Sequence, residues 1–291
     1  MPELPEVQGL VDFLTERTVG RKVAAVHVLG IQTLKTFSPA PDALAGGTVA
    51  EVARRGKWLD LRVEDLPDGD LHLVFHLARA GWLRWHEKLP GGVSRSPKSP
   101  VALRVDLDDG SGFSLTEAGT RKRLAVYVVA SPEEVPAIAS LGIEPLSAEF
   151  TRDAFAAILA GRKQQIKGVL REQGTIAGIG NAYSDDILHA ARMSPFAISS
   201  SLDDEAVTRL YNAIGEVLRP AIEASSGRPA AELKDAKRSG MRVHGRAGQE
   251  CGVCGDVIRE VSFADSALQY CATCQTGGKI LADRRMSKLL R

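Results

Sequence analysis

The stretch Cys251-Gly252-Val253-Cys254, followed after sixteen residues by Cys271-Ala272-Thr273-Cys274, holds all four cysteines of the chain. Each close pair can offer two thiolates to one tetrahedral ion, and the segment between the pairs suits a β-hairpin that brings them together. Disulfides are the poorer explanation, because no cysteine lies elsewhere and a reducing compartment is expected. The spacing therefore predicts one structural Zn²⁺ held by Cys251, Cys254, Cys271 and Cys274, with no open position for catalysis.

Basic residues surround this predicted zinc hairpin. The segment 228–291 contains twelve Lys and Arg against seven Asp and Glu, although the net charge of the whole chain is only +1. A locally basic surface can contact phosphates while acidic residues elsewhere balance the total. A solvated basic tail explains the same composition and stays open as the alternative.

Two further patterns divide the rest of the chain. Residues 5–18 begin with Pro5 and continue with apolar residues at helical spacing, which predicts an amphipathic helix. From Arg21 to Ala130, short apolar runs alternate with turn sequences such as Pro67-Asp68-Gly69-Asp70, which predicts a β-sandwich. Helical periodicity returns in the ranges 151–161, 164–172, 181–192 and 203–224, and the polar stretch 225–240 is predicted to be a loop.

These patterns predict an α+β fold: an N-terminal β-sandwich with flanking helices, a helical domain and a C-terminal zinc-binding β-hairpin. The predicted divisions are a β-sandwich domain 1–131, a linker 132–148, a helical domain 149–240, a zinc finger 241–277 and a basic extension 278–291. No apolar run approaches the roughly 20 residues of a membrane span, and no basic leader precedes an apolar stretch. A cytoplasmic protein is therefore expected.

The zinc hairpin together with the stretch Met1-Pro2-Glu3-Leu4-Pro5-Glu6-Val7 resembles the formamidopyrimidine-DNA glycosylase (Fpg/Nei) family over nearly the whole chain. Three more stretches agree in order and type with a lysine-bearing strand, a helix–two-turn–helix motif and the start of the zinc finger: 54–59 (RRGKWL), 176–183 (IAGIGNAY) and 243–246 (VHGR). The resemblance implies a monomeric base-excision repair enzyme that acts on damaged double-stranded DNA.

The resemblance also implies which residues carry the chemistry. Once Met1 is removed, the secondary amine of Pro2 can attack the anomeric carbon and form an iminium, because an α-amino group has a pKa near 8 as a rough reference. Glu3 matches the residue that protonates the sugar ring oxygen, and Lys57 matches a lysine that contacts phosphate and sugar. Strand cleavage by β,δ-elimination follows from the same likeness. An ordinary acid at a helix start and a solvent-facing strand lysine are the plainer interpretations of Glu3 and Lys57.

Phosphate and base contacts are implied at six further positions. The glycines before Asn181 place this residue at a helix start, where side-chain amide and backbone N–H groups can bind a phosphate, although a plain helix cap explains it too. His76 stands in an apolar run, where a packed histidine is the commoner case. The full set of expected DNA-binding residues is His76, Arg79, Arg123, Lys167, Asn181 and Arg246.

Two departures from the family pattern leave the substrate open. Arg79 replaces a methionine that fills the gap left by the extruded base, and Leu124 replaces a phenylalanine beside the retained Arg123. Ser266 stands where the family has an arginine at the hairpin tip, so it offers one neutral hydrogen bond in place of a bidentate contact. The preferred lesion is therefore undetermined. A paralogue that binds damaged or abasic DNA with little excision is the main alternative, and a zinc-ribbon adaptor for RNA or protein is a third.

Overall fold

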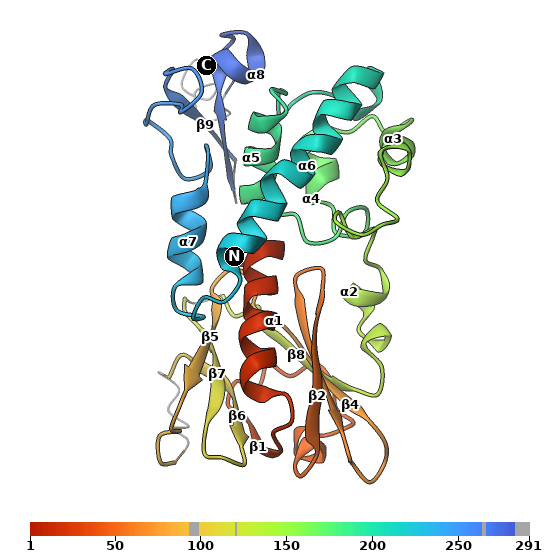
Figure 1. The fold of residues 1–291 in the computed structure, drawn as a ribbon, viewed down its shortest axis with the longest axis vertical. Coiled ribbons are helices and arrows are strands. Elements are labelled where there is room, and N and C mark those ends of the chain that lie inside the picture. Colours follow the sequence, from red (N-terminus) through yellow and green to blue (C-terminus); the bar gives the residue numbers. More distant parts are fainter. Residues whose placement is uncertain (93–98, 120, 264–265, 283–291) are drawn as a thin grey trace. The chain divides into compact units, whose positions relative to one another are not determined.

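The computed structural model describes residues 1–92, 99–119, 121–263 and 266–282, which form two compact units (Figure 1). The first unit comprises Met1–Ser140 together with Ala224–Lys234. The second comprises Leu141–Glu223 together with Asp235–Arg291. Most of the predicted basic extension lies outside the described residues.

The first unit is built on two four-stranded antiparallel sheets. Their orders are β2-β3-β4-β8 and β1-β6-β7-β5. The strands are β1 (Val23–Val28), β2 (Thr48–Arg55), β3 (Trp58–Glu64), β4 (Leu71–His76), β5 (Gly81–His86), β6 (Val101–Leu107), β7 (Gly112–Glu117) and β8 (Ala125–Val129). Phe75 from the first sheet and Phe113 from the second are fully buried with ring centroids 6.1 Å apart. The inner faces of the two sheets thus share one apolar core, which confirms the predicted sandwich.

Helix α1 (Leu4–Thr18) adds its apolar face to this core through Leu10 and Leu14. Pro5 lies in its first turn, where a missing N–H costs nothing. Glu3 is the N-cap, and its backbone N–H donates to Glu6 Oε2 at 2.9 Å, so the helix start is fixed one residue before Leu4. The expected helix at 5–18 is therefore confirmed almost to the residue.

Short helical turns complete the first unit, and the last two lie in the first half of the predicted linker 132–148. They are η1 (Pro41–Leu44), η2 (Pro132–Glu134) and α2 (Pro136–Ala139). The segment Ala224–Lys234 also belongs to this unit, because Trp82 Nε1 donates to Ala230 O at 3.0 Å and Leu233 is fully buried in the sandwich core.

The second unit is helical and ends in a β-hairpin. Its helices are α3 (Arg152–Leu159), α4 (Ile166–Arg171), α5 (Asn181–Ala190) and η3 (Ser199–Ser201), with α6 (Asp204–Ser225) except for its last two residues, and α7 (Leu233–Gly240) except for its first two. The hairpin strands β9 (Ile258–Ser262) and β10 (Ala267–Cys271) pair antiparallel, and α8 (Ala272–Thr276) follows directly. The expectation of a loop throughout 225–240 is wrong, because α7 occupies its second half.

Candidate functional site

The start of α1 gathers two buried carboxyl groups next to Pro2. Glu3 is 2% and Glu6 1% exposed, and Pro2 is itself buried. The positive end of the helix dipole favours negative charge at these positions. The Glu3 and Glu6 side chains form a reciprocal capping box, in which each carboxyl group accepts the backbone N–H of the other residue.

Lys57 is buried although it occupies a hairpin turn. Gly56 and Lys57 form the two-residue connection between β2 and β3, and Gly56 has φ +56°, a value that favours glycine. Arg54 closes the turn with a 3.1 Å bond to Gly56 O and joins it to α1 through Gln8 Oε1 at 3.0 Å. The Lys57 side chain therefore lies in a turn and not on the expected strand. Because the residue is only 6% exposed, the interpretation as a solvent-facing lysine is wrong.

His76 is held as a neutral hydrogen-bond donor. Its ring lies 4.8 Å from the Trp58 ring, and Ala78 N–H donates to its Nδ1 at 3.2 Å, which places the ring proton on Nε2. Burial, and then the charge of Lys57, lower the pKa of His76 to about 4. At neutral pH the Nε2–H group can thus bind an anion without carrying a positive charge itself.

The turn between β4 and β5 presents Arg79 to solvent. Ala78 adopts φ +51°, a left-handed conformation that residues other than glycine rarely adopt. Gly81 N–H donates to Leu77 O at 2.9 Å, and a Cβ at Gly81 would lie 2.1 Å from that oxygen. This tight turn exposes Arg79 at its tip, three residues after His76.

Glu117, at the end of β7, was missed by the sequence analysis. It is 2% exposed, and its Oε1 accepts N–H bonds from Arg123 at 2.6 Å and Leu124 at 3.0 Å. Lys122 Nζ donates to its backbone oxygen at 2.5 Å. The buried carboxylate thereby fixes the backbone at Arg123 and Leu124, at the end of a run of three exposed cationic side chains, 121–123. Only the partners identify this role, because a glutamate at a strand end carries no distinctive sequence signal.

In the second unit, Lys167 lies under the first turn of α5. It is 6% exposed, and its Nζ donates to Asn181 O at 3.1 Å, Ser184 Oγ at 2.8 Å and Asp185 Oδ1 at 2.5 Å. Three acceptors match the three protons of the ammonium group. Lys167 therefore supports the helix start from within.

Asn181 joins the helix start to the zinc hairpin. Its Nδ2 donates to Ala267 O at 2.8 Å, at the first residue of β10 and next to Ser266. Among the described residues its Oδ1 has no partner. The Asn181 side chain thus fixes the hairpin tip against α5.

The two acids of α5 hold the segment that leads into the hairpin. Asp186 accepts backbone N–H groups from Arg242, Val243 and His244 at 2.6, 3.0 and 3.1 Å. Burial raises the pKa of Asp186, and these backbone bonds oppose the shift. Asp185 accepts from His244 Nδ1 at 2.7 Å. Both carboxylates therefore orient the chain just before Arg246.

Arg246 is bound to its own loop. Its Nε donates to Gln249 Oε1 at 3.0 Å and one terminal nitrogen donates to Met241 O at 3.2 Å. The guanidinium group is partly exposed, so its remaining N–H groups can reach a ligand.

The four cysteines converge at one point. Their Sγ atoms all lie within 4.8 Å of one another, with Cys254 and Cys271 at 3.4 Å and Cys251 and Cys274 at 3.9 Å. A tetrahedral zinc–thiolate site with Zn–S near 2.3 Å has S–S edges of about 3.8 Å. The donor set and its spacing therefore fit one structural zinc ion, as the sequence predicts.

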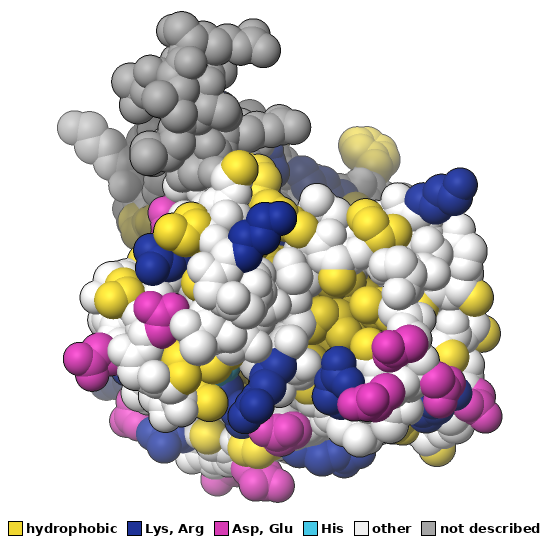
Figure 2. Space-filling model, turned by 90° about the horizontal axis from the view of Figure 1, so that it is seen from above, with side chains coloured by type: hydrophobic (Ala, Val, Ile, Leu, Met, Phe, Trp, Pro, Cys, Tyr) yellow, Lys and Arg dark blue, Asp and Glu magenta, His cyan; other side chains and the backbone are white. Residues whose placement is uncertain are grey.

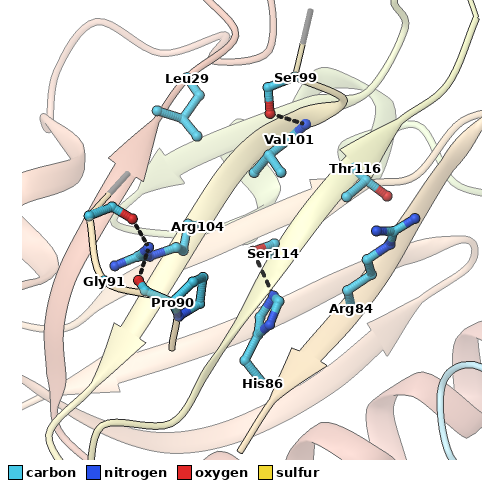
Figure 3. Close-up of a pocket in the computed structure, with 11 residues that line it drawn as sticks. Leu29, Arg84, His86, Pro90, Gly91, Ser99, Val101, Arg104, Ser114 and Thr116 are labelled. Atoms are coloured by element: carbon cyan, nitrogen blue, oxygen red, sulfur yellow. Dashed lines mark hydrogen bonds between the residues drawn. The ribbon is translucent and has the colours of Figure 1, made fainter. Parts of the chain in front are cut away.

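A separate pocket of about 490 Å³ lies on the outer face of β5, β6 and β7 (Figure 3). His86 points at Ser114 across this face, with Nε2 3.1 Å from Oγ, while Arg104 turns back to Pro90 O. Burial, and then the charges of Arg104 and Arg84, lower the pKa of His86. None of the predicted site residues lines the pocket, and Arg104 is already paired with Asp106.

Charged side chains are mixed on the face shown in Figure 2. Lys and Arg stand among Asp, Glu and apolar side chains there and do not form one basic patch. Among the described residues, no helix is long and apolar enough to cross a membrane.

Three family models match successive parts of the chain. The formamidopyrimidine-DNA glycosylase N-terminal domain matches residues 1–126, the formamidopyrimidine-DNA glycosylase H2TH domain matches 141–230, and the zinc finger found in FPG and IleRS matches 248–277.

Curated relatives and solved structures agree with these matches. A formamidopyrimidine-DNA glycosylase of Symbiobacterium thermophilum is 35% identical over 98% of this chain and 93% of its own length. An uncharacterized formamidopyrimidine-DNA glycosylase-like protein of Mycobacterium tuberculosis is 55% identical over 50% of this chain and 93% of its own. The Lactococcus lactis glycosylase bound non-covalently to DNA with an abasic site has a TM-score of 0.80 at 26% identity, covering 94% of this chain and 99% of that one. The same L. lactis protein bound to DNA containing N7-benzyl-Fapy-dG has a TM-score of 0.82.

Proposed function

This chain belongs to the formamidopyrimidine-DNA glycosylase family, and on that premise we propose that it excises a damaged base from duplex DNA through a covalent bond to Pro2. Its enzyme class is that of a DNA glycosylase and abasic-site lyase. The observation that carries the proposal is that Pro2 and the next residue, Glu3, are both buried at the start of α1.

The first step uses the lone pair of the Pro2 nitrogen, which is available once Met1 has been removed. This nitrogen attacks the anomeric carbon, the bond to the damaged base breaks, and the base leaves with the bonding electrons and takes up the proton that the Pro2 amine loses. Glu3 protonates the sugar ring oxygen as the ring opens to the iminium. The iminium acidifies the adjacent sugar carbon, so that β-elimination and then δ-elimination release the two phosphates, and hydrolysis regenerates Pro2.

Lys57 and His76 are proposed to hold the phosphate next to the lesion. Lys57 supplies a buried positive charge, and the neutral His76 ring supplies an N–H donor. Glu3 supplies a proton to the sugar, whereas Lys57 and His76 donate hydrogen bonds to the phosphate. The three side chains therefore have separate tasks. Their burial supports preorganisation, which lets the site bind charge without rearranging first.

The remaining contacts are proposed at exposed cations and at the start of α5. Arg79 and Arg123 reach into the space left by the extruded base, and Arg246 contacts a phosphate. Asn181 and the backbone at its helix start receive a second phosphate. Lys167 acts beneath this contact by fixing Asn181, because its own three protons are already bound. The zinc ion holds the hairpin and takes no part in the chemistry.

Ser266 supports the second candidate function, a paralogue that binds abasic DNA with little excision. Its backbone oxygen accepts from Phe263 N at 2.7 Å, and its side chain is too short to replace an arginine at the tip. Loss of a charged phosphate contact at this place would weaken catalysis more than binding if the contact forms only in the transition state.

Borohydride trapping separates the two functions. The protein is incubated with a duplex that contains one abasic site, and the covalent adduct is measured after reduction. We expect an adduct that falls sharply in Pro2→Gly and persists in the matched control Pro5→Ala, which removes a second buried proline of the same helix start. Tight binding without an adduct supports the binding paralogue. Retention of Met1 on trapped protein, seen by mass spectrometry, would refute the mechanism.

We further propose that the enzyme acts as a monomer in the cytoplasm, at the nucleoid when it is bound to DNA. Sedimentation of the protein with the abasic duplex should give one protein per lesion. A panel of duplexes with oxidised purines, oxidised pyrimidines and bulky adducts identifies the substrate, and it tests whether Arg79 in place of the methionine reduces or redirects activity.

A further inference from the structure

His189, in the last turn of α5, contacts the zinc site from outside the hairpin. It is 4% exposed, and its Nε2 lies 3.3 Å from Cys251 Sγ. Its other ring nitrogen, Nδ1, is buried and has no hydrogen-bond partner among the described residues. Among the described residues, the hydrogen bond available to this ring is therefore the one to a sulfur atom.

The chemistry of a zinc-bound cysteine decides which way this bond runs. A ligating cysteine is a thiolate, so its sulfur can only accept a hydrogen bond. A neutral imidazole carries a single N–H, and a buried N–H without an acceptor costs more than a bare nitrogen lone pair. The thiolate receives a donor, and the ring N–H receives an acceptor, when the proton is on Nε2 and points at Cys251. Nδ1 then keeps the lone pair.

Two of the other three sulfur atoms, those of Cys254 and Cys271, receive hydrogen bonds from the hairpin backbone. Cys274 N–H lies 3.5 Å from Cys271 Sγ, and the backbone N–H of Asp256 donates to Cys254. Four thiolates around one Zn²⁺ carry excess negative charge, which such donors disperse. The donor to Cys251 is the His189 side chain, which belongs to α5. The position of this sulfur atom therefore depends on α5.

We propose that His189 is a positioning residue of the zinc site, which donates its Nε2–H to the thiolate of Cys251 and fixes this ligand to helix α5. The same helix carries Asn181 at its start and the acids Asp185 and Asp186 that orient the segment leading into the hairpin. One rigid helix thereby connects zinc retention with the position of the hairpin tip. This inference rests on the zinc site alone and not on the reaction at Pro2.

Zinc release from the full-length, zinc-loaded protein tests the proposal. The wild type, His189→Asn and His189→Gln are mixed with an excess of a chromogenic chelator, and the release rate is measured. Loss of an outer hydrogen bond to a metal ligand typically costs about 10–100-fold in metal affinity. We expect His189→Asn to release zinc about 10-fold faster or more, because its shorter side chain does not reach the sulfur. His189→Gln places an amide N–H near the position of Nε2 and should restore slow release.

Two spectroscopic measurements distinguish the hydrogen bond from simple packing. In ¹⁵N-resolved spectra of the zinc-loaded wild type, His189 should be the neutral tautomer with its proton on Nε2. In the Co²⁺-substituted protein, the sulfur-to-metal charge-transfer band should shift in His189→Asn and return towards the wild-type position in His189→Gln. A proton on Nδ1, or equal zinc release from the wild type and His189→Asn, would overturn the proposal.

Discussion

Replacement of Lys167 by methionine tests whether this residue supports α5 or contacts DNA directly. Methionine keeps the length and apolar character of the side chain and removes the charge. In the structure the Lys167 and Asp185 side chains are 7% and 0% exposed and 2.5 Å apart, so the substitution leaves a buried carboxylate without its main counter-charge.

The magnitude follows from that burial. Removing one partner of a buried ion pair typically costs about 3–5 kcal/mol, because the other charge stays desolvated. Asp185 keeps two donors, His244 Nδ1 at 2.7 Å and Gln269 N at 3.2 Å. We therefore expect the low end of the range, a loss of about 3 kcal/mol in the free energy of unfolding. The exposed Lys163 is the matched control, and Lys163→Met should change it by about 0.5 kcal/mol or less.

Two assays are needed. Denaturant unfolding of the second unit gives the stability change, and the salt dependence of binding to an abasic duplex counts the neutralised phosphates. Each lost phosphate contact lowers the slope of log K against log salt by about 0.9. A Lys167 that only supports the helix lowers the affinity without changing this slope. A slope reduced by about one unit together with unchanged stability would refute the structural role and restore Lys167 as a phosphate contact.

Three further predictions concern the first unit. Ala78→Gly relieves the backbone strain at φ +51° and should stabilise the protein by about 1 kcal/mol, measured by urea unfolding. The control Ala80→Gly changes a residue without positive φ and should destabilise the protein. Equal effects of the two substitutions would exclude strain at Ala78. Folding lowers the pKa of His76 from 6.5 to about 4, so the unfolded chain takes up a proton at a higher pH than the folded protein does. The free energy of unfolding should therefore decrease by up to about 3 kcal/mol as the pH falls through that interval. His76→Gln should remove most of this decrease, and a variant with the wild-type pH profile would contradict the prediction. Glu117→Ala leaves the Arg123 N–H group without its acceptor and should weaken binding to an abasic duplex several-fold, measured by fluorescence anisotropy. Arg123→Ala should weaken binding to a similar extent, and the double mutant should lose little more. Additive losses would mean that the two residues act separately.

The element types of this fold were predictable because their signals are local. Pro5 and the spacing of Leu10 and Leu14 locate α1, and the four cysteines identify the zinc site by their spacing alone. Helix α7 was missed because its segment is polar and lacks an apolar repeat. Its first residue, Leu233, is buried in the sandwich core, a contact with residues far away in the sequence.

The candidate site shows the same division. The sequence predicts Pro2, Glu3 and Lys57 as site residues, and its prediction of a helix start at Asn181 is confirmed. The burial of Lys57 in a turn was not, because its exposure depends on how α1 and the β2–β3 hairpin pack together.

The sequence by itself determined which chemical groups this protein has and which local elements carry them, since the spacing of cysteines, prolines and apolar residues acts over a few positions of the chain. The tertiary structure decided what each group touches. It pairs Lys167 with Asp185, Glu117 with the backbone of Arg123, and His189 with Cys251, which is 62 residues away. Such partners set the charge, the hydrogen bonding and the accessibility of a side chain, and they exist only once distant segments have packed together.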